Sequence, residues 1–177
     1  MTPSLALATL EDTAAIRACY DDARNRQREL AVIEWPEFSE DSIRAEIAER
    51  RLWKVQDGGL LAGVFTAAYS DPAIWREREL HRHIYLHRIA RAPGSRMPGL
   101  FAKVLDWAID HARERGAAGI RMDTWASNDG LIAYYARFGF ELVARVRLDA
   151  DLRLPAHYHG NDFALLERPS DSAAGPT

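Results

Sequence analysis

The sequence predicts an α/β fold of the mixed α+β kind, with a central mixed β-sheet and about four helices. In the first half, apolar and β-branched runs separated by turn signals indicate strands, with two helical segments between them. In the second half, strand and helix alternate along the chain. Strands joined by a helical crossover pair in parallel. We therefore expect a sheet that contains both antiparallel and parallel pairs.

The first half is expected to form a meander of strands with two inserted helices. Residues 4–8 are a short strand, and Thr9 with Asp12 three residues later forms a capping box that starts a helix. Ser39 caps a second helix. Asp57-Gly58-Gly59 is a hairpin turn, because glycine adopts the positive φ that such turns need. The strands joined by this turn are predicted at Leu52–Gln56 and Leu60–Tyr69.

The second half is expected to alternate strands and helices. In chain order, we predict a polar connection at 70–82, a strand at Ile84–Ala90, a helix at Leu100–Arg115, a strand at Ala118–Thr124, a helix at Leu131–Phe138, and strands at Phe140–Leu148 and Asn161–Glu167. Gly116 and Gly139 would end the two helices. Residues 1–168 are predicted to form one domain, and the small polar residues 169–177 a flexible tail.

Composition argues against several classes of protein. The formal net charge of −3 argues against a nucleic-acid partner, because such binders need a basic surface. No apolar run approaches the ~20 residues that span a bilayer, and the first residues lack the layout of a signal peptide. The single cysteine, Cys19, has no intrachain partner, which fits a reducing compartment. We therefore expect a cytoplasmic protein that binds neither nucleic acid nor membrane.

Four segments of the second half form a pattern. Residues 85–90 belong to a predicted strand, and residues 96–101 (Arg-Met-Pro-Gly-Leu-Phe) come just before the long helix. A helix start has unpaired N–H groups and a positive dipole end, so it suits a phosphorylated ligand. Residues 123–128 end in an asparagine, and residues 134–140 carry two tyrosines before Gly-Phe. These segments resemble the core of the GNAT-type N-acetyltransferase superfamily.

The resemblance implies the acyl-CoA N-acyltransferase fold and an enzyme that moves the acetyl group of acetyl-CoA directly to a primary amine of a small molecule or peptide. The end of the strand at 85–90, which resembles the family's central strand, would pair with the pantetheine arm of this co-substrate. The 96–101 loop would hold its pyrophosphate, and Tyr135 would be the general acid for the leaving thiolate. The cofactor-binding residues implied are Ile89, Ala90, Arg91, Arg96, Met97, Gly99, Leu100, Phe101, Asn128 and Tyr135.

Two residues of the loop depart from the family's pattern. Phe101 stands where the family places glycine or alanine, which allow close approach of a phosphate. Pro98 removes one N–H group that could bond a phosphate oxygen. These departures motivate an alternative, a GNAT-fold binding or regulatory protein with weakened or lost acetyl-CoA catalysis.

The general base and the acceptor side stay open at this level. His87 has an ordinary pKa suited to accepting a proton near neutrality, and strand alternation would put it on one face with Tyr85 and Ile89. The favoured interpretation of His87 is nevertheless a hydrogen-bonded structural histidine. Glu34 and Glu37 are other candidates for the base, as is ordered water. Together with Trp35 they form an acidic, aromatic loop that could bind a cationic acceptor or fill the core.

Two His-x-His pairs, His81/His83 and His157/His159, would each lie on one strand face and could suggest a metal. A third ligand is missing from the pattern, so we expect surface histidines and no metal site. The expected partner is a small-molecule amine. A homodimer is a further expectation, in which Trp53 or Trp75 could contribute to the interface.

Overall fold

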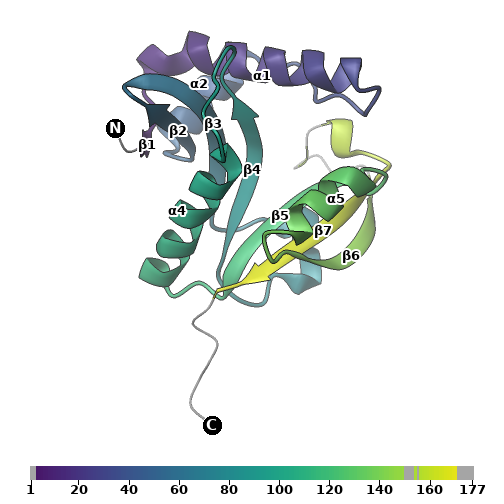
Figure 1. The fold of residues 1–177 in the computed structure, drawn as a ribbon. Coiled ribbons are helices and arrows are strands. Elements are labelled where there is room, and N and C mark those ends of the chain that lie inside the picture. Colours follow the sequence, from purple (N-terminus) through teal and green to yellow (C-terminus); the bar gives the residue numbers. More distant parts are fainter. Residues whose placement is uncertain (1–2, 150–153, 155, 171–177) are drawn as a thin grey trace. The chain divides into compact units, whose positions relative to one another are not determined.

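The computed structural model describes residues 3–149, 154 and 156–170 (Figure 1). Its strands form a seven-stranded sheet in the order β1-β2-β3-β4-β5-β7-β6. The pair β4–β5 is parallel and the pairs on either side of the sheet, β1–β2 and β6–β7, are antiparallel. The predicted mixed sheet is thereby confirmed. The chain divides into two compact units: unit 1 is residues 1–67 and 87–107, and unit 2 is residues 68–86 and 108–177.

Unit 1 contains the first three strands and the first two helices. Its elements are β1 (Ser4–Leu7), α1 (Thr13–Glu29), α2 (Glu40–Ala48), β2 (Leu52–Asp57), β3 (Leu60–Ala68), the end of β4 (His83–Arg91) and the first half of α4 (Leu100–Arg115). Strand alternation assigns the two faces of β2 and β3. Val64 packs in a buried cluster with Tyr20 of α1. On the other face, the rings of Trp53 and Phe65 meet Trp107 of α4, with centroids 4.5 and 5.0 Å away.

The turn and cap signals of unit 1 are confirmed. The Thr9 N–H donates to the Asp12 carboxylate at 2.7 Å, which closes the capping box on a short 3-10 turn that leads into α1. The Ser42 N–H donates to the Ser39 hydroxyl at 3.2 Å at the start of α2. Cys19 of α1 is wholly buried, and burial together with the nearby Asp22 charge raises its thiol pKa to about 12.

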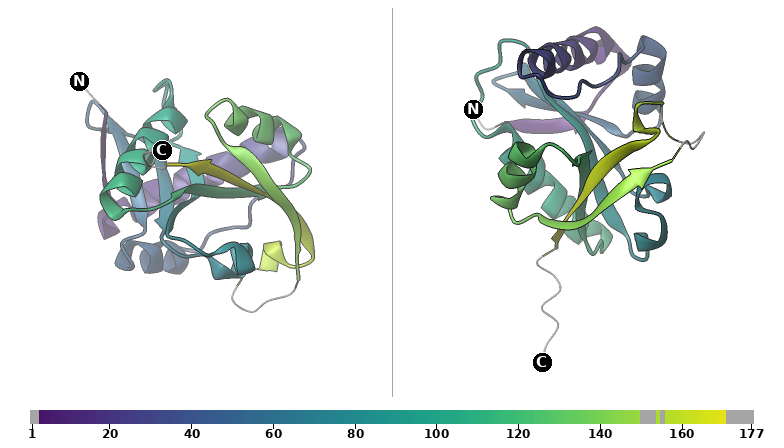
Figure 2. Two further views of the ribbon diagram at one scale, coloured as in Figure 1. Left: turned by 90° about the horizontal axis from the view of Figure 1, so that it is seen from below. Right: turned by 90° about the vertical axis from the view of Figure 1, so that its right-hand side faces the viewer.

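Unit 2 contains the other strands. Its elements are α3 (Pro72–Trp75), the start of β4, the end of α4, β5 (Gly119–Trp125), α5 (Asp129–Ala136), β6 (Glu141–Leu148) and β7 (Asn161–Pro169). Helix α4 returns the chain so that β5 runs parallel to β4, whereas β7 runs antiparallel to β5. Strand β6 pairs with β7 and is the last strand of the order (Figure 2). A buried cluster that includes Trp75, Tyr85 and Phe163 packs on these strands.

The connection at 70–82 differs from the prediction. It contains the additional helix α3, so the described residues hold five α-helices rather than about four. Trp75 at the end of α3 is wholly buried, beside Tyr85 and under the guanidinium of Arg121 at 4.1 Å. Trp75 is therefore not the exposed interface residue that we expected. A four-residue helix has too little periodicity to be seen in the sequence.

The end of the described chain also differs from the prediction. Pro169 belongs to β7, and Ser170 is buried with its N–H donating to the Ala118 carbonyl at 2.9 Å. These two residues, assigned above to the tail, belong to the folded part, while 171–177 lie outside the described residues. Within the ranges that the structure describes, no helix is both long and apolar enough to cross a bilayer.

Candidate active site

The loop after β4 is folded back on the strand end in unit 1. Gly94, with φ +73°, and a hydrogen bond from the Ser95 N–H to the Ala92 carbonyl (3.1 Å) make the turn. The Arg91 guanidinium then donates to the Met97 carbonyl at 2.6 Å. Arg91, predicted to act through its backbone, thus also braces the loop with its side chain.

The start of α4 has the geometry of an anion seat. Gly99 adopts φ +64°, a left-handed conformation that favours glycine, and the first intrahelical bond runs from Lys103 N–H to its carbonyl. The N–H groups of the intervening residues, Leu100 among them, have no intrahelical acceptor. Phe101 is only 7% exposed, so its ring packs inward and does not fill the exposed side of the turn. Of the two residues that depart from the family pattern, Phe101 is the bulkier, and its ring does not block the helix start.

Arg96 lies on the same loop and is exposed. Within the described part of the chain, its guanidinium makes no hydrogen bond or ion pair. A free guanidinium beside an open helix start suits a pyrophosphate, because it matches phosphate oxygens with paired donors. The residues present therefore fit the phosphorylated part of acetyl-CoA.

Gly63 of β3 is a site residue that sequence reasoning missed. A Cβ at this position would lie 2.7 Å from the Ala90 carbonyl oxygen and 2.7 Å from a Leu100 methyl carbon. Only glycine lets β3 approach both the end of β4 and the start of α4 this closely. A glycine inside a predicted strand was the available signal.

Arg88 has a strained backbone conformation within β4 that the sequence does not predict. Its φ is +50°, in the left-handed region that arginine rarely adopts, inside a strand that runs from His83 to Arg91. A residue in this conformation departs from the extended backbone of a regular strand. The prediction that His87 and Ile89 share a face with Tyr85 assumes regular alternation through Arg88, and it stays a prediction. His87 itself is half-buried, and its role as a base stays a prediction.

An ion pair with a buried carboxylate holds the strained residue. The Arg88 guanidinium donates to the carboxylate of Glu46, which is 5% exposed on α2. The Thr66 hydroxyl donates to the other Glu46 oxygen at 3.4 Å. The Arg88 guanidinium also lies 4.9 Å from the ring centre of Phe38. The strained position of β4 is thus tied to α2 and to the loop that precedes it.

The predicted acceptor loop is tied to α1. Glu34 pairs with Arg28 at 2.8 Å, and hydrogen bonding from that guanidinium lowers the Glu34 pKa. Glu37 pairs with Arg17 at 3.5 Å. Trp35 packs against the buried cluster of unit 1, as expected from the core-filling interpretation. The carboxylates are partly neutralised by arginines, so the loop is less acidic than its sequence suggests.

In unit 2, Asn128 begins helix α5. Its side-chain oxygen accepts the Leu131 N–H at 3.1 Å, so the helix runs over Asp129–Ala136, two residues earlier at each end than predicted. The cap uses the side-chain oxygen of Asn128. It also fixes the orientation of the amide, so the NH₂ group is held in one direction. The Arg145 guanidinium bonds the Ala126 carbonyl and holds the turn before the helix.

Tyr135 lies on α5 and is half-buried, with its ring 6.1 Å from that of Phe140. Burial raises the pKa of its hydroxyl well above the ordinary value, and the neighbouring Tyr134 and Asp123 act in the same direction. The hydroxyl is therefore protonated at neutral pH. That is the protonation state that a general acid needs.

The two His-x-His pairs differ from the prediction that each lies on one exposed strand face. His83 is 2% exposed, with Nδ1 2.9 Å from the His81 carbonyl oxygen and Nε2 3.7 Å from Glu167. Burial lowers its pKa. His157 lies in a 3-10 turn, and His159 bonds a backbone carbonyl at 2.9 Å. The expectation of surface histidines is thus wrong for His83, whose environment is that of a core residue.

Comparison with known proteins decides the family. Residues 13–140 match the family model described as "Acetyltransferase (GNAT) family". The chain belongs to this family. A curated relative, the N-acetyltransferase YesJ of Bacillus subtilis (strain 168), is 34% identical over 73 residues, and this match covers 41% of each protein.

Two solved structures show the same fold. The GNAT-family acetyltransferase of Listeria monocytogenes superposes with a TM-score of 0.74 at 20% identity, covering 94% of each chain. The protein YncA of Salmonella typhimurium, solved with its cofactor acetyl-CoA, superposes with a TM-score of 0.64 at 19% identity, covering 99% of this chain and 98% of that one.

The predicted family and fold are thereby confirmed. Membership makes the chain an acetyltransferase by class, of a family whose co-substrate is acetyl-CoA. The predicted cofactor-binding residues fall in both units: 89–101 in unit 1, and Asn128 with Tyr135 in unit 2.

Proposed function

We propose that this chain transfers the acetyl group of acetyl-CoA directly to a primary amine of a small molecule or a peptide. The observation that carries the proposal is the start of α4, where Gly99 at φ +64°, inward-packed Phe101 and unpaired Arg96 leave an open anion seat. The acetyl-CoA found with the Salmonella protein of the same fold supports this choice of co-substrate.

Each predicted residue then has a task. The helix start and Arg96 hold the pyrophosphate, and the backbone at 89–91 pairs with the pantetheine arm. The thioester of acetyl-CoA supplies the activated acetyl group. The left-handed conformation of Arg88 turns the backbone that follows it, which suits N–H groups that polarise a carbonyl oxygen. The Asn128 amide is a further donor to the cofactor.

Tyr135 donates the proton that the departing thiolate takes up. Its raised pKa keeps the hydroxyl protonated, and a simple thiol has a pKa of about 8.5, so the thiolate benefits from a nearby donor. The base that receives the amine's proton is one of His87, Glu34 and Glu37, or ordered water. The pairing of both glutamates with arginines makes His87 or water the better choice.

Thermal unfolding with and without acetyl-CoA is the first test. A ligand at about 100 times its dissociation constant adds ~2.7 kcal/mol of stability, or roughly 5–10 °C in Tm for a chain of this size. Release of the CoA thiol over a panel of small amines and short peptides then identifies the acceptor class. A protein that is stabilised by CoA but acetylates none of these would instead be the binding or regulatory protein of the alternative.

Tyr135→Phe tests the general acid. We expect turnover to fall about 100-fold, because general-acid catalysis contributes that much or more, while the affinity for CoA is kept. Tyr134→Phe is the matched control, since Tyr134 is the adjacent tyrosine on α5 and is more exposed. Equal turnover in wild type and Tyr135→Phe would remove Tyr135 from the mechanism.

A further inference from the structure

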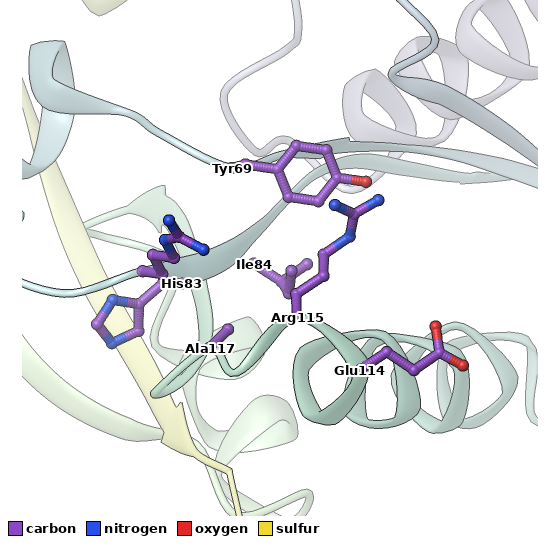
Figure 3. A pocket seen from close by; sticks show the side chains of 7 residues that line it. Tyr69, His83, Ile84, Glu114, Arg115 and Ala117 are labelled. Atoms are coloured by element: carbon purple, nitrogen blue, oxygen red, sulfur yellow. The ribbon is translucent and has the colours of Figure 1, made fainter.

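A pocket of about 490 Å³ lies in unit 2 at the start of β4 (Figure 3). Its volume is in the range of small-molecule sites. The lining residues come from the segment after β3, the start of β4 and the end of α4, and they are Tyr69, Arg82, His83, Ile84, Glu114, Arg115 and Ala117. The predicted acetyl-CoA residues of β4 are its last three, so this pocket is built on the other end of the strand.

Arg115 is held in place without its charge being neutralised. Its Nε donates to His111 Nε2 at 2.8 Å, and its guanidinium lies 4.4 Å from the ring centre of Tyr69. Figure 3 shows the side chain reaching from the helix toward that ring. Among the described residues, no carboxylate pairs with its terminal nitrogens. A fixed and unpaired guanidinium is prepared to bind an anion with little loss of side-chain entropy.

Arg82 brings a second positive charge to the same pocket. It is exposed, and within the described ranges its guanidinium has no hydrogen-bond or ion-pair partner. The acidic lining residue is Glu114, which is 75% exposed in its side chain and extends away from His83 and Ala117 in Figure 3. The pocket therefore carries two guanidinium groups against one carboxylate at its rim.

The remaining polar groups do not compete for the ligand. His111 Nε2 accepts from the Arg115 Nε at 2.8 Å, and the Tyr69 hydroxyl oxygen lies at the same distance from it, so His111 contacts both side chains. Tyr69 thus serves as a platform for the guanidinium. His83 uses Nδ1 on the His81 carbonyl and is buried as a neutral wall of the pocket. Among the described lining residues, Arg82 and Arg115 supply the positive charge for a charged ligand.

We propose that this pocket binds a small oxyanion, the carboxylate or phosphate group of a metabolite, through Arg115 and Arg82. The site is separate from the acetyl-CoA residues proposed above. It is an accessory site whose occupant joins the first residues of β4 to the last turn of α4. Bidentate pairing with guanidinium is the shared chemistry of both oxyanions.

Calorimetric titration of the whole protein with inorganic phosphate tests the proposal. CoA is present at saturation, so that the loop at 96–101 is filled; acetate in a parallel titration distinguishes a carboxylate site from a phosphate site. We expect saturable binding of one anion, weakened about tenfold or more in Arg115→Gln and in Arg82→Gln, because each loses one charge-assisted contact. Arg113→Gln, on the same helix but outside the pocket, should bind as wild type does.

Two results would overturn the site: no saturable binding of either anion to the wild type, or equal affinity in wild type and Arg115→Gln with both folded by circular dichroism. Failure of the proposed enzymatic function is seen separately, as absence of CoA binding. In that case the phosphate and acetate titrations are run without CoA on the same four proteins and are judged by the same differences.

Discussion

In each unit, the described residues include an arginine–glutamate pair with one buried partner, and the two arginines differ in backbone conformation. In unit 1, Arg88 pairs with the buried Glu46 and stacks on Phe38 from a backbone with φ +50°. In unit 2, Arg121 of β5 pairs with Glu167 at 2.8 Å. The φ angle of Arg121 is not positive, so its backbone is not in the left-handed region.

The difference is between an arginine that joins several elements from a regular strand and an arginine that is held in a strained backbone conformation. Arg121 donates to Glu167, to the Arg78 carbonyl at 3.0 Å and to the Tyr85 hydroxyl at 3.2 Å, so its charge is satisfied from several elements. Arg88 has one carboxylate and one ring, and it occupies a conformation that costs roughly 1–3 kcal/mol. Such strain collects at functional sites, and Arg88 lies directly before the residues that we assign to the pantetheine arm.

The largest effect is expected from breaking the unit 1 pair. Arg88→Met leaves the Glu46 carboxylate buried without a cation, which should lower the free energy of unfolding by about 3–5 kcal/mol. Urea unfolding followed by circular dichroism measures this loss. The double variant Arg88→Met/Glu46→Met should recover most of it, because an apolar replacement of both partners is often neutral.

The matched change in unit 2 sharpens the comparison. Glu167→Gln leaves Arg121 with two further acceptors, so its loss should be about 1.5–3 kcal/mol, that of a hydrogen bond to a charged group. A loss in Glu167→Gln as large as that in Arg88→Met would mean that the two pairs are equivalent. The distinction between the two arginines would then be wrong.

A smaller effect is expected at the crowded glycines, one in each unit. A Cβ at Gly63 would meet the Ala90 carbonyl oxygen, and one at Gly119 would collide with the Arg168 carbonyl oxygen. Each alanine variant should lose about 1–3 kcal/mol of stability, as overpacking does. Gly130→Ala is the control, because a Cβ at Gly130 has only the Asn128 side-chain oxygen nearby, at 4.0 Å. Stable Gly63→Ala protein would show that β3 and β4 can separate without cost.

The smallest effect concerns pH and His83. In the folded state, burial is the main cause that lowers the pKa of His83, and the Arg121 and His81 charges act in the same direction. The hydrogen bond to the His81 carbonyl and the Glu167 charge raise the pKa but do not cancel this effect. The unfolded chain therefore binds a proton near pH 6.5 that the folded chain does not. Stability is lost as pH falls below that value, by at most ~1.4 kcal/mol per pH unit for one proton.

Urea unfolding at several pH values between 7.5 and 5.5 measures this dependence. His83→Gln should give a flatter profile than the wild type, whereas His81→Gln, at an exposed position of the same segment, should keep the wild-type slope. Identical slopes in wild type and His83→Gln would show that the folded protein protonates His83 as readily as the unfolded chain does.

Much of the fold follows from local signals. The Thr9 capping box, the Gly58–Gly59 turn and the helix ends at Gly116 and Gly139 act over three or four residues, so they can be read directly from the sequence. The predicted start of α5 is two residues late, because Asn128, which is predicted to face the cofactor, also caps this helix. The organisation of residues 1–168 as one domain stays a prediction.

The candidate site was predicted only where a motif marks it. The loop at 96–101 is predicted because a helix start and the family pattern coincide there, and its binding of acetyl-CoA stays a prediction. The strain at Arg88 and its pairing with Glu46 depend on contacts 42 residues apart, which leave no local trace. The pairing of Glu34 with Arg28 is likewise set by how the loop packs on α1. The general base and the acceptor class depend on tertiary contacts of this kind, so the sequence leaves both open.

The buried thiol of Cys19 makes the chain a convenient reporter of its own opening. Cys19 is the single cysteine of the sequence, and its raised pKa and full burial make it unreactive while unit 1 is folded. Thiol reagents can therefore follow CoA release without a background signal from the enzyme. Over longer times, the rate at which Cys19 is labelled would report how often unit 1 unfolds locally, without an added probe.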